Sequence, residues 1–176
     1  MMDQRLAKIK LLALDVDGTL TDGSIIVIGR DQTKVFSVHD GLGMKVAMSC
    51  GLKIAWITYS PAEAVKDRAE SLGITDLYLN TSRKTEALKE LAQKHGLSME
   101  QIAYMGDDLN DLPAMELAGL RFAPANAVCE VKQAADILTE RSGGRGAVRE
   151  AIEKILEARG EWDNAGESLR CAGLGS

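Results

Sequence analysis

The chain has 176 residues, of which 45% are hydrophobic and only 4% aromatic, and its 21 Lys and Arg against 26 Asp and Glu give a net charge of -5. This length and apolar content suffice for one hydrophobic core, so we expect a single domain over residues 1–160 with a flexible tail over 161–176. The balanced charge and few aromatic residues argue against nucleic-acid binding. No apolar run is long enough to span a membrane and no signal peptide precedes the domain, so a cytoplasmic protein is expected.

Short β-branched and aliphatic runs recur along the chain with room for a helix between successive runs. Unbroken apolar stretches, such as residues 11–16, are typical of parallel strands that are covered on both faces. Right-handed crossovers then place helices on both sides, so the sequence predicts an α/β fold with a doubly wound parallel sheet. The expected strands cover residues 11–16, 53–58, 76–79, 102–105, 120–123 and 136–138.

The predicted helices have recognisable ends. Ser60-Pro61-Ala62-Glu63 resembles a capping box that opens a helix over 60–72, with Gly73 as its stop. One segment breaks the alternation: residues 25–28 and 33–38, around a turn containing Gly29, predict an antiparallel hairpin. Further helices are expected over residues 84–95, 110–117 and 145–159.

Polar residues collect where the predicted strands end. Asp15 and Asp17 end the first strand and Thr58 ends the second, while Lys84 opens the helix after the third. Gly106-Asp107-Asp108-Leu109-Asn110-Asp111 follows the fourth strand. An isolated D-x-D-G could equally form a turn with a helix cap, but the carboxyl ends of parallel strands meet at one edge of a sheet, so together these features predict a site.

Each residue type at this edge suits phosphoryl transfer. Asp15 could attack phosphorus to form an aspartyl-phosphate, and Asp15 with Asp107 could hold Mg2+ against the charge of the phosphate. Lys84 would supply a fixed positive charge and Thr58 a hydroxyl donor, while the loop at Gly18 would offer backbone N–H groups. Asp17 could protonate the leaving alcohol and later deprotonate water.

These residues resemble the four motifs of the haloacid dehalogenase superfamily: D-x-D-G-T at 15–19, Thr58, Lys84 and G-D-D-x-x-D at 106–111. The resemblance implies a Rossmann-like fold, Mg2+ dependence and a phosphatase, with Asp15 as nucleophile and Asp17 as general acid and base. It implies that Asp15, the Asp17 carbonyl and Asp107 hold the metal. Asp108 is then expected beside these ligands, and Asp111 is expected to orient Lys84 or the loop.

The intervals between these motifs are too short for a cap domain, which leaves the site open. A neighbouring subunit could close it, and the hairpin over 25–38 carries apolar Ile26, Ile28 and Phe36 that would suit packing against copies of itself. The alternative is a solvated arm.

Four further motifs narrow the resemblance to the 3-deoxy-D-manno-octulosonate 8-phosphate phosphatases over residues 9–160: T-D-G at 21–23, F-x-x-x-D-G-x-G at 36–43, R-A-x-x-L-G-I at 68–74 and G-G-R-G-A-V-R-E at 143–150. This family implies a homotetramer in which adjacent subunits close each site, and a role in lipopolysaccharide synthesis. The same subfamily includes phosphatases of nine-carbon, sialic-acid-type 9-phosphates. A non-catalytic tetramerisation module is a third possibility, which the intact set of catalytic residues argues against.

One departure affects the choice of substrate. The family usually has T-G-R where this chain has Thr58-Tyr59-Ser60, so the fork and charge of an arginine are missing. We expect the eight-carbon sugar-acid phosphate as the substrate, and the nine-carbon compound remains the alternative. Ser60 could instead cap a helix, and Arg68 could lie on a solvated helix face. The candidate substrate-binding residues are Thr19, Asp40, Tyr59, Ser60, Arg68 and Arg145.

Overall fold

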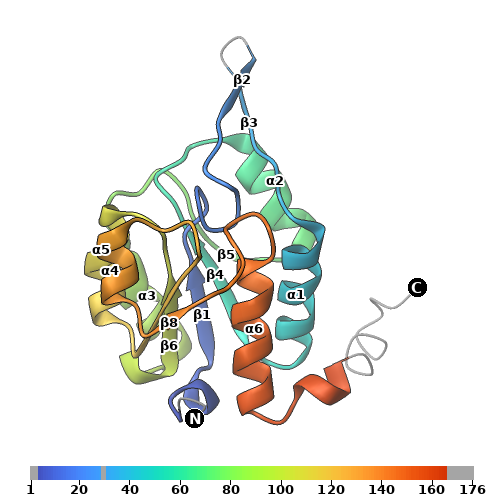
Figure 1. Ribbon diagram of the computed structural model, residues 1–176, viewed down its shortest axis with the longest axis vertical. Helices are drawn as coiled ribbons and strands as arrows, with labels where there is room; N and C mark the ends of the chain where they lie inside the picture. The colour runs from blue at the N-terminus through green and yellow to red at the C-terminus, as the bar shows by residue number, and fades with distance from the viewer. Residues whose placement is uncertain (1–3, 29–30, 166–176) are drawn as a thin grey trace.

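The structure is a computed structural model, and it describes residues 4–28 and 31–165. Six strands form one sheet in the order β5-β4-β1-β6-β7-β8, and all neighbouring strands are parallel (Figure 1). The strands are β1 (Leu11–Leu14), β4 (Lys53–Ile57), β5 (Asp76–Tyr78), β6 (Ile102–Met105), β7 (Leu120–Ala123) and β8 (Ile137–Leu138). The predicted doubly wound α/β fold is therefore confirmed.

Helices cover both faces of this sheet (Figure 1). On one face lie α1 (Val38–Ser49), α2 (Glu63–Leu72) and α6 (Ala147–Ala158), and on the other lie α3 (Lys84–His95), α4 (Leu112–Leu117) and α5 (Cys129–Ala134). Short 3-10 turns are η1 (Leu6–Lys8), η2 (Met99–Gln101), η3 (Leu109–Asp111) and η4 (Trp162–Asn164).

Strand β1 shows why its sequence is apolar throughout. Leu12 and Leu14 belong to the core under α1 and α6, whereas Leu11 and Ala13 belong to the core under α3 and α4. Successive strand residues point to opposite faces, so a central strand with helices on both sides needs an apolar residue at every position. All four side chains are fully buried.

Three helices begin later than predicted, and one of them is α4, which begins at Leu112 instead of residue 110. Helix α2 begins at Glu63 and its N-cap residue Ala62 has no side-chain cap, so the capping box expected at Ser60 is wrong. The Ser60 hydroxyl instead accepts a hydrogen bond from the Ala62 N–H, which forms a turn before the helix. Helix α6 begins after Gly146, whose φ of 103° is outside the helical region.

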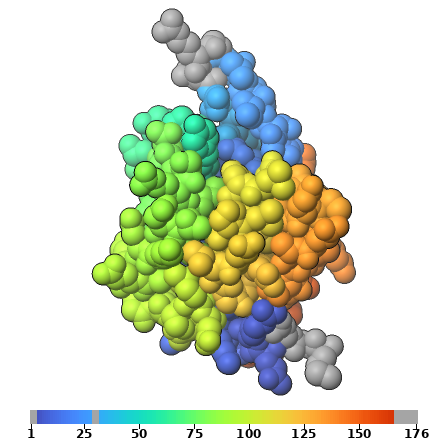
Figure 2. Space-filling view, turned by 90° about the vertical axis from the view of Figure 1, so that its left-hand side faces the viewer, coloured from blue at the N-terminus to red at the C-terminus, as the bar shows by residue number. Residues whose placement is uncertain are grey.

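The predicted hairpin is present as β2 (Ile26–Ile28) paired antiparallel with β3 (Asp31–Thr33). Its second strand was predicted over residues 33–38, which is wrong, because β3 ends at Thr33 and α1 begins at Val38. It projects from the edge of the molecule where the central strands end, and its tip at residues 29–30 lies outside the described residues (Figures 1 and 2). Ile26, Val27 and Ile28 are 45%, 65% and 65% exposed, so the described part of the chain leaves both faces of β2 uncovered.

The sequence predicts a flexible tail from residue 161, and within it the structure describes η4 and the residues up to 165. Trp162 in η4 packs against the core, and Ala165 is buried. The rest of the predicted tail, residues 166–176, lies outside the described residues. No helix between residues 4 and 165 has both the length and the apolar character needed to cross a bilayer.

Candidate active site

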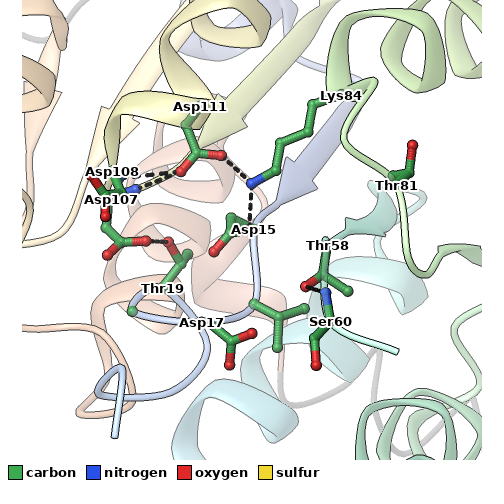
Figure 3. A network of polar contacts seen from close by, with 12 residues as sticks. Asp15, Asp17, Thr19, Thr58, Ser60, Thr81, Lys84, Asp107, Asp108 and Asp111 are labelled. Carbon is green, nitrogen blue, oxygen red and sulfur yellow. Dashed lines mark hydrogen bonds and ion pairs between the residues drawn. The ribbon is translucent and has the colours of Figure 1, made fainter. Parts of the chain in front are cut away.

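The candidate site lies at the carboxyl ends of β1 and β6, which are neighbours in the sheet. From β1 the chain passes to β4 and β5 on one side, whereas β6 begins the other side, so the strand order reverses here. Such a reversal leaves a crevice beyond the strand ends in open α/β sheets. Figure 3 shows Asp15 and Asp17 on the loop after β1: Asp15 lies beside Lys84 and Asp111, whereas the Asp17 carboxylate points toward the side of Ser60.

Lys84 and Asp15 form the buried centre of this site. Lys84 is the first residue of α3, and its Nζ lies 2.6 Å from Asp15 Oδ1 and 2.6 Å from Asp111 Oδ1. All three side chains are at most 7% exposed (Figure 3). A buried ammonium needs such partners because an unpaired charge in the interior is strongly unfavourable. Lys84 Nζ, from α3, therefore contacts both the loop after β1 and η3.

Asp111, which the sequence predicts to orient Lys84 or the loop, contacts both of them. Its Oδ1 also accepts a hydrogen bond of 2.7 Å from the Tyr104 hydroxyl, and its Oδ2 accepts from the backbone N–H groups of Asp107 and Asp108. A Cβ on Gly106 would lie 2.2 Å from Asp111 Cγ, so this motif requires glycine at that position. Both Asp111 oxygens are thus engaged by protein donors.

This centre has more carboxylates than cations, and the excess of negative charge shifts the pKa values of its groups. Burial, and then the negative charge of Asp111, raises the pKa of Asp15 well above its usual range, although Lys84 opposes the shift. Burial, followed by the charges of Asp111 and Asp108, raises the pKa of Asp107 to about 7. The pKa of Lys84 is also raised, because attraction to Asp15 and Asp111 outweighs its burial.

A hard divalent cation fits this excess of negative charge. Carboxylate oxygens of Asp15, Asp107 and Asp111 lie within 4.8 Å of one another. Mg2+ prefers such oxygen ligands. Because the Asp111 oxygens are engaged by Lys84, Tyr104 and backbone N–H groups, Asp15 and Asp107 are the better placed side-chain ligands.

The loop after β1 approaches Asp107 closely. Gly18 has a φ of 96°, and a Cβ there would lie 1.9 Å from Asp107 Oδ2. The Gly18 N–H donates to Thr21 Oγ1, so this N–H is engaged within its own loop. Thr19 is fully buried and its hydroxyl donates to Asp107 Oδ1 at 3.4 Å (Figure 3). Thr19 therefore contacts Asp107, and its burial gives no support to the predicted contact with substrate.

Thr58 and Ser60 form the opposite wall. The Thr58 hydroxyl accepts a 3.0 Å hydrogen bond from the Ser60 N–H (Figure 3). The proton of the Thr58 hydroxyl is not used in this bond, so it can be donated to another acceptor. Ser60 is 8% exposed and lies in the turn before α2, whereas Tyr59 is 64% exposed. Of the predicted pair, only Tyr59 is accessible to a substrate.

Asp40 was predicted at the substrate mouth, but the structure places its carboxylate against the beginning of α6. Its carboxylate is 1% exposed and accepts hydrogen bonds from the backbone N–H groups of Gly146 and Arg149. It therefore caps the beginning of α6 from α1, because the first N–H groups of a helix lack intrahelical partners.

The two predicted cations lie in different places. Arg68 is half-buried between α2 and α1, where a Cβ on Gly41 would lie 2.4 Å from its guanidinium, so it packs against a helix and is not on the solvated face. Arg145 is exposed and pairs at 3.5 Å with Asp22, which lies on the loop after β1. Arg145 thus lies beside the loop after β1.

Asp108 is exposed and its carboxylate caps η3 through the Leu109 N–H, which gives no support to a place beside the metal ligands.

The sequence analysis missed two residues. Asn126 Nδ2 donates to the Gly18 carbonyl at 2.9 Å, and its Oδ1 accepts from the Gly143 N–H at 2.6 Å. Asn126 follows β7, so the carboxyl-end rule could have found it. Lys34, which follows β3, pairs with the Asp17 carboxylate. No local pattern indicates this contact, because it depends on where the hairpin returns.

Comparisons with known proteins show the family of the chain. The family of haloacid dehalogenase-like hydrolases matches residues 60–152. The 3-deoxy-D-manno-octulosonate 8-phosphate phosphatase KdsC of Escherichia coli (strain K12) is 44% identical over 164 residues, which cover 92% of this chain and 87% of the relative.

Two solved structures have the same fold. The 3-deoxy-D-manno-octulosonate 8-phosphate phosphatase of Yersinia pestis matches with a TM-score of 0.89 and 41% identity, over 91% of this chain and 87% of that one. The enzyme of Moraxella catarrhalis, solved in complex with magnesium ion, phosphate ion and a KDO molecule, matches with a TM-score of 0.88 and 40% identity, over 91% of this chain and 92% of that one. The chain therefore belongs to the haloacid dehalogenase-like hydrolases and, within them, to the 3-deoxy-D-manno-octulosonate 8-phosphate phosphatases.

Proposed function

We propose that this protein is a Mg2+-dependent phosphatase that hydrolyses 3-deoxy-D-manno-octulosonate 8-phosphate to the free sugar acid and phosphate. The observation that carries the proposal is the buried Asp15 carboxylate, held 2.6 Å from Lys84 and close to Asp107 at the crevice. Identity of 44% to a phosphatase of this substrate supports the same reaction.

In the proposed mechanism Asp15 attacks phosphorus and forms an aspartyl-phosphate. Lys84 orients the Asp15 carboxylate and balances charge, and the Thr58 hydroxyl donates to a phosphoryl oxygen. Asp15, Asp107 and the Asp17 carbonyl would hold Mg2+, which when bound neutralises charge on the phosphoryl group. Asp17 gives a proton to the departing alcohol oxygen and then takes one from the water that attacks phosphorus, which releases phosphate and restores Asp15.

A nine-carbon keto-sugar-acid 9-phosphate is the second candidate substrate. It is favoured by the replacement of the usual Gly-Arg pair by Tyr59-Ser60, because the buried Ser60 cannot provide the bidentate cation of an arginine. Exposed Tyr59 and Arg145 remain as candidate contacts for the distal part of either substrate.

The proposal includes a homotetramer in which hairpins pack together and neighbouring subunits close each site. Support comes from Ile26, Val27 and Ile28, which are exposed apolar residues on the two faces of β2 in a projecting arm. Changing Ile26 and Ile28 to Lys should lower the mass measured by light scattering, and an unchanged tetramer would contradict the packing of the hairpins.

The proposal also includes a cytoplasmic location and a role in lipopolysaccharide synthesis, which follow from the family resemblance.

The test is phosphate release from matched eight-carbon and nine-carbon sugar-acid phosphates, with Mg2+ and with a chelator. We expect a higher kcat/KM on the octulosonate and no release with chelator. Asp15→Asn should abolish turnover because it removes the nucleophile's charge at constant volume, whereas Asp67→Asn, on the exposed surface of α2, should retain it. Preference for the nine-carbon compound would select the second candidate. Metal-independent turnover, or turnover by Asp15→Asn, would refute the mechanism.

A further inference from the structure

The Asp17 side chain meets a cation that comes from the hairpin. Lys34 Nζ forms an ion pair with Asp17 Oδ1, and this is the partner that the described residues provide for that carboxylate. The two side chains differ in accessibility: Lys34 is 1% exposed, whereas Asp17 is 34% exposed at the mouth of the crevice. A lysine of the arm therefore reaches inward to the carboxylate on which the proposed proton transfers depend.

Burial makes this contact a strong constraint on both groups. An ammonium that is removed from water needs a hydrogen-bonded anion, since an uncompensated buried charge costs several kcal/mol. The described residues offer Lys34 the Asp17 carboxylate. The carboxylate of Asp17 is otherwise partly in solvent, where an aspartate can rotate between staggered conformers. The ion pair selects one of these conformers.

The segment that carries Lys34 is itself fixed to the domain. Exposure alternates along residues 34–36: Lys34 is buried, Val35 is 61% exposed and Phe36 is half-buried. The Phe36 ring stacks on Trp56, with centroids 5.9 Å apart and an interplanar angle of 13°. Trp56 lies in β4, the strand that leads to Thr58. Phe36 thus anchors the base of the hairpin, and the base of the hairpin holds Lys34 against Asp17.

We propose that Lys34 is a positioning residue for the reaction: its ammonium donates to Oδ1 of Asp17 and so fixes the direction of Oδ2, the oxygen that carries the proton given to the departing alcohol and later takes one from water. The inference rests on the proposed phosphatase function and on Asp17 as its acid and base. It also gives the hairpin a role inside its own subunit, in addition to any role in assembly.

The leaving group distinguishes positioning of Asp17 from general support of the fold. A sugar alcohol departs as an alkoxide unless it is protonated, so cleavage of the sugar phosphate depends on Asp17. Dinitrophenolate is a stable anion and departs without a proton, so cleavage of 2,4-dinitrophenyl phosphate does not. The ratio kcat/KM reports only the steps up to departure of the alcohol, so the later hydrolysis of the aspartyl-phosphate does not enter the comparison.

The experiment measures kcat/KM of the full-length protein with Mg2+ on the octulosonate phosphate and on 2,4-dinitrophenyl phosphate. Lys34→Met removes the charge and keeps most of the aliphatic stem, and Lys34→Arg restores a cation. Lys53→Met is the matched control, since Lys53 is exposed at the opposite end of β4. Because general acid catalysis contributes about 100-fold to 10,000-fold, we expect Lys34→Met to lose roughly 100-fold on the sugar phosphate and less than about threefold on the aryl phosphate.

Lys34→Arg should recover part of the selective loss, and Lys53→Met should change neither rate. A ratio of the two kcat/KM values within about threefold of wild type in Lys34→Met would overturn the proposal, whether both rates fall or neither does. Should Lys34→Met fail to fold by circular dichroism, Lys34→Gln is judged by the same ratio. Wild-type protein that releases no phosphate from either compound would refute the proposed function instead.

Discussion

Replacement of Asp40 separates two roles for this residue, at the substrate mouth or at the start of α6. In the structure its Oδ1 lies 2.8 Å from the Arg149 nitrogen and its Oδ2 lies 3.2 Å from the Gly146 nitrogen. Asp40→Ala removes both acceptors and leaves two backbone donors without partners near the beginning of α6. Binding of substrate plays no part in this effect.

The size of the effect follows from those two donors. A buried donor that loses its acceptor costs about 1–3 kcal/mol, and water entering the space left by the carboxylate recovers part of this, so we expect a loss of about 2–4 kcal/mol in the free energy of unfolding. For a domain of this size each kcal/mol lowers Tm by about 2–4 °C, which gives about 4–16 °C for Asp40→Ala. Asp40→Asn keeps one acceptor, so its loss should be about half as large.

The assay is thermal unfolding followed by circular dichroism, together with KM for the sugar phosphate well below the new Tm. Asp67→Ala is the control, because Asp67 is exposed on α2 and surface substitutions usually change stability by less than about 0.5 kcal/mol. We expect a lower Tm with KM within about twofold of wild type. A KM raised about tenfold or more with an unchanged Tm would refute the capping role and return Asp40 to the substrate mouth.

Three further results are expected. Since the pKa of Asp107 is about 7 and protons compete with Mg2+ for its carboxylate, Mg2+ affinity measured by calorimetry should fall about tenfold between about pH 8 and about pH 6, and a pH-independent affinity would contradict Asp107 as a ligand. Hydrogen bonds from Arg121 hold the pKa of Asp136 well below its usual range, so its contribution to stability is present above about pH 4 and lost as the pH falls through the folded-state pKa. The Tm difference between wild type and Asp136→Asn should therefore narrow below about pH 4, and a constant difference would be inconsistent with this ion pair. Gly143→Ala places a Cβ 1.8 Å from the Gly18 carbonyl oxygen, so phosphate release should fall sharply, whereas Gly51→Ala, with no atom within 4 Å of the new Cβ, should retain it; equal activities would disprove the close approach.

The sequence determined the sheet and the centre of the site because both depend on local patterns. Apolar runs of strand length, separated by helix-length segments, predict parallel strands, and the carboxyl ends of such strands meet at one edge. This rule predicts that Asp15, Lys84 and Asp107 lie at one edge of the sheet. In the structure Asp15 lies within a few ångströms of both Lys84 and Asp107. Asn126 could have been found by the same rule, since it also follows a strand of this sheet.

Only the tertiary structure decided which partner each polar side chain meets. The D-G pair at residues 40 and 41 has the same local signal whether its carboxylate faces a crevice or a helix end, and the arrival of α6 more than 100 residues later settles the question. Likewise, Lys34 lies 17 residues from Asp17 and meets it only because the hairpin returns across the loop after β1. Hydrophobic periodicity fixes which face of an element is buried, but the distance between atoms on remote segments depends on how all the elements pack together.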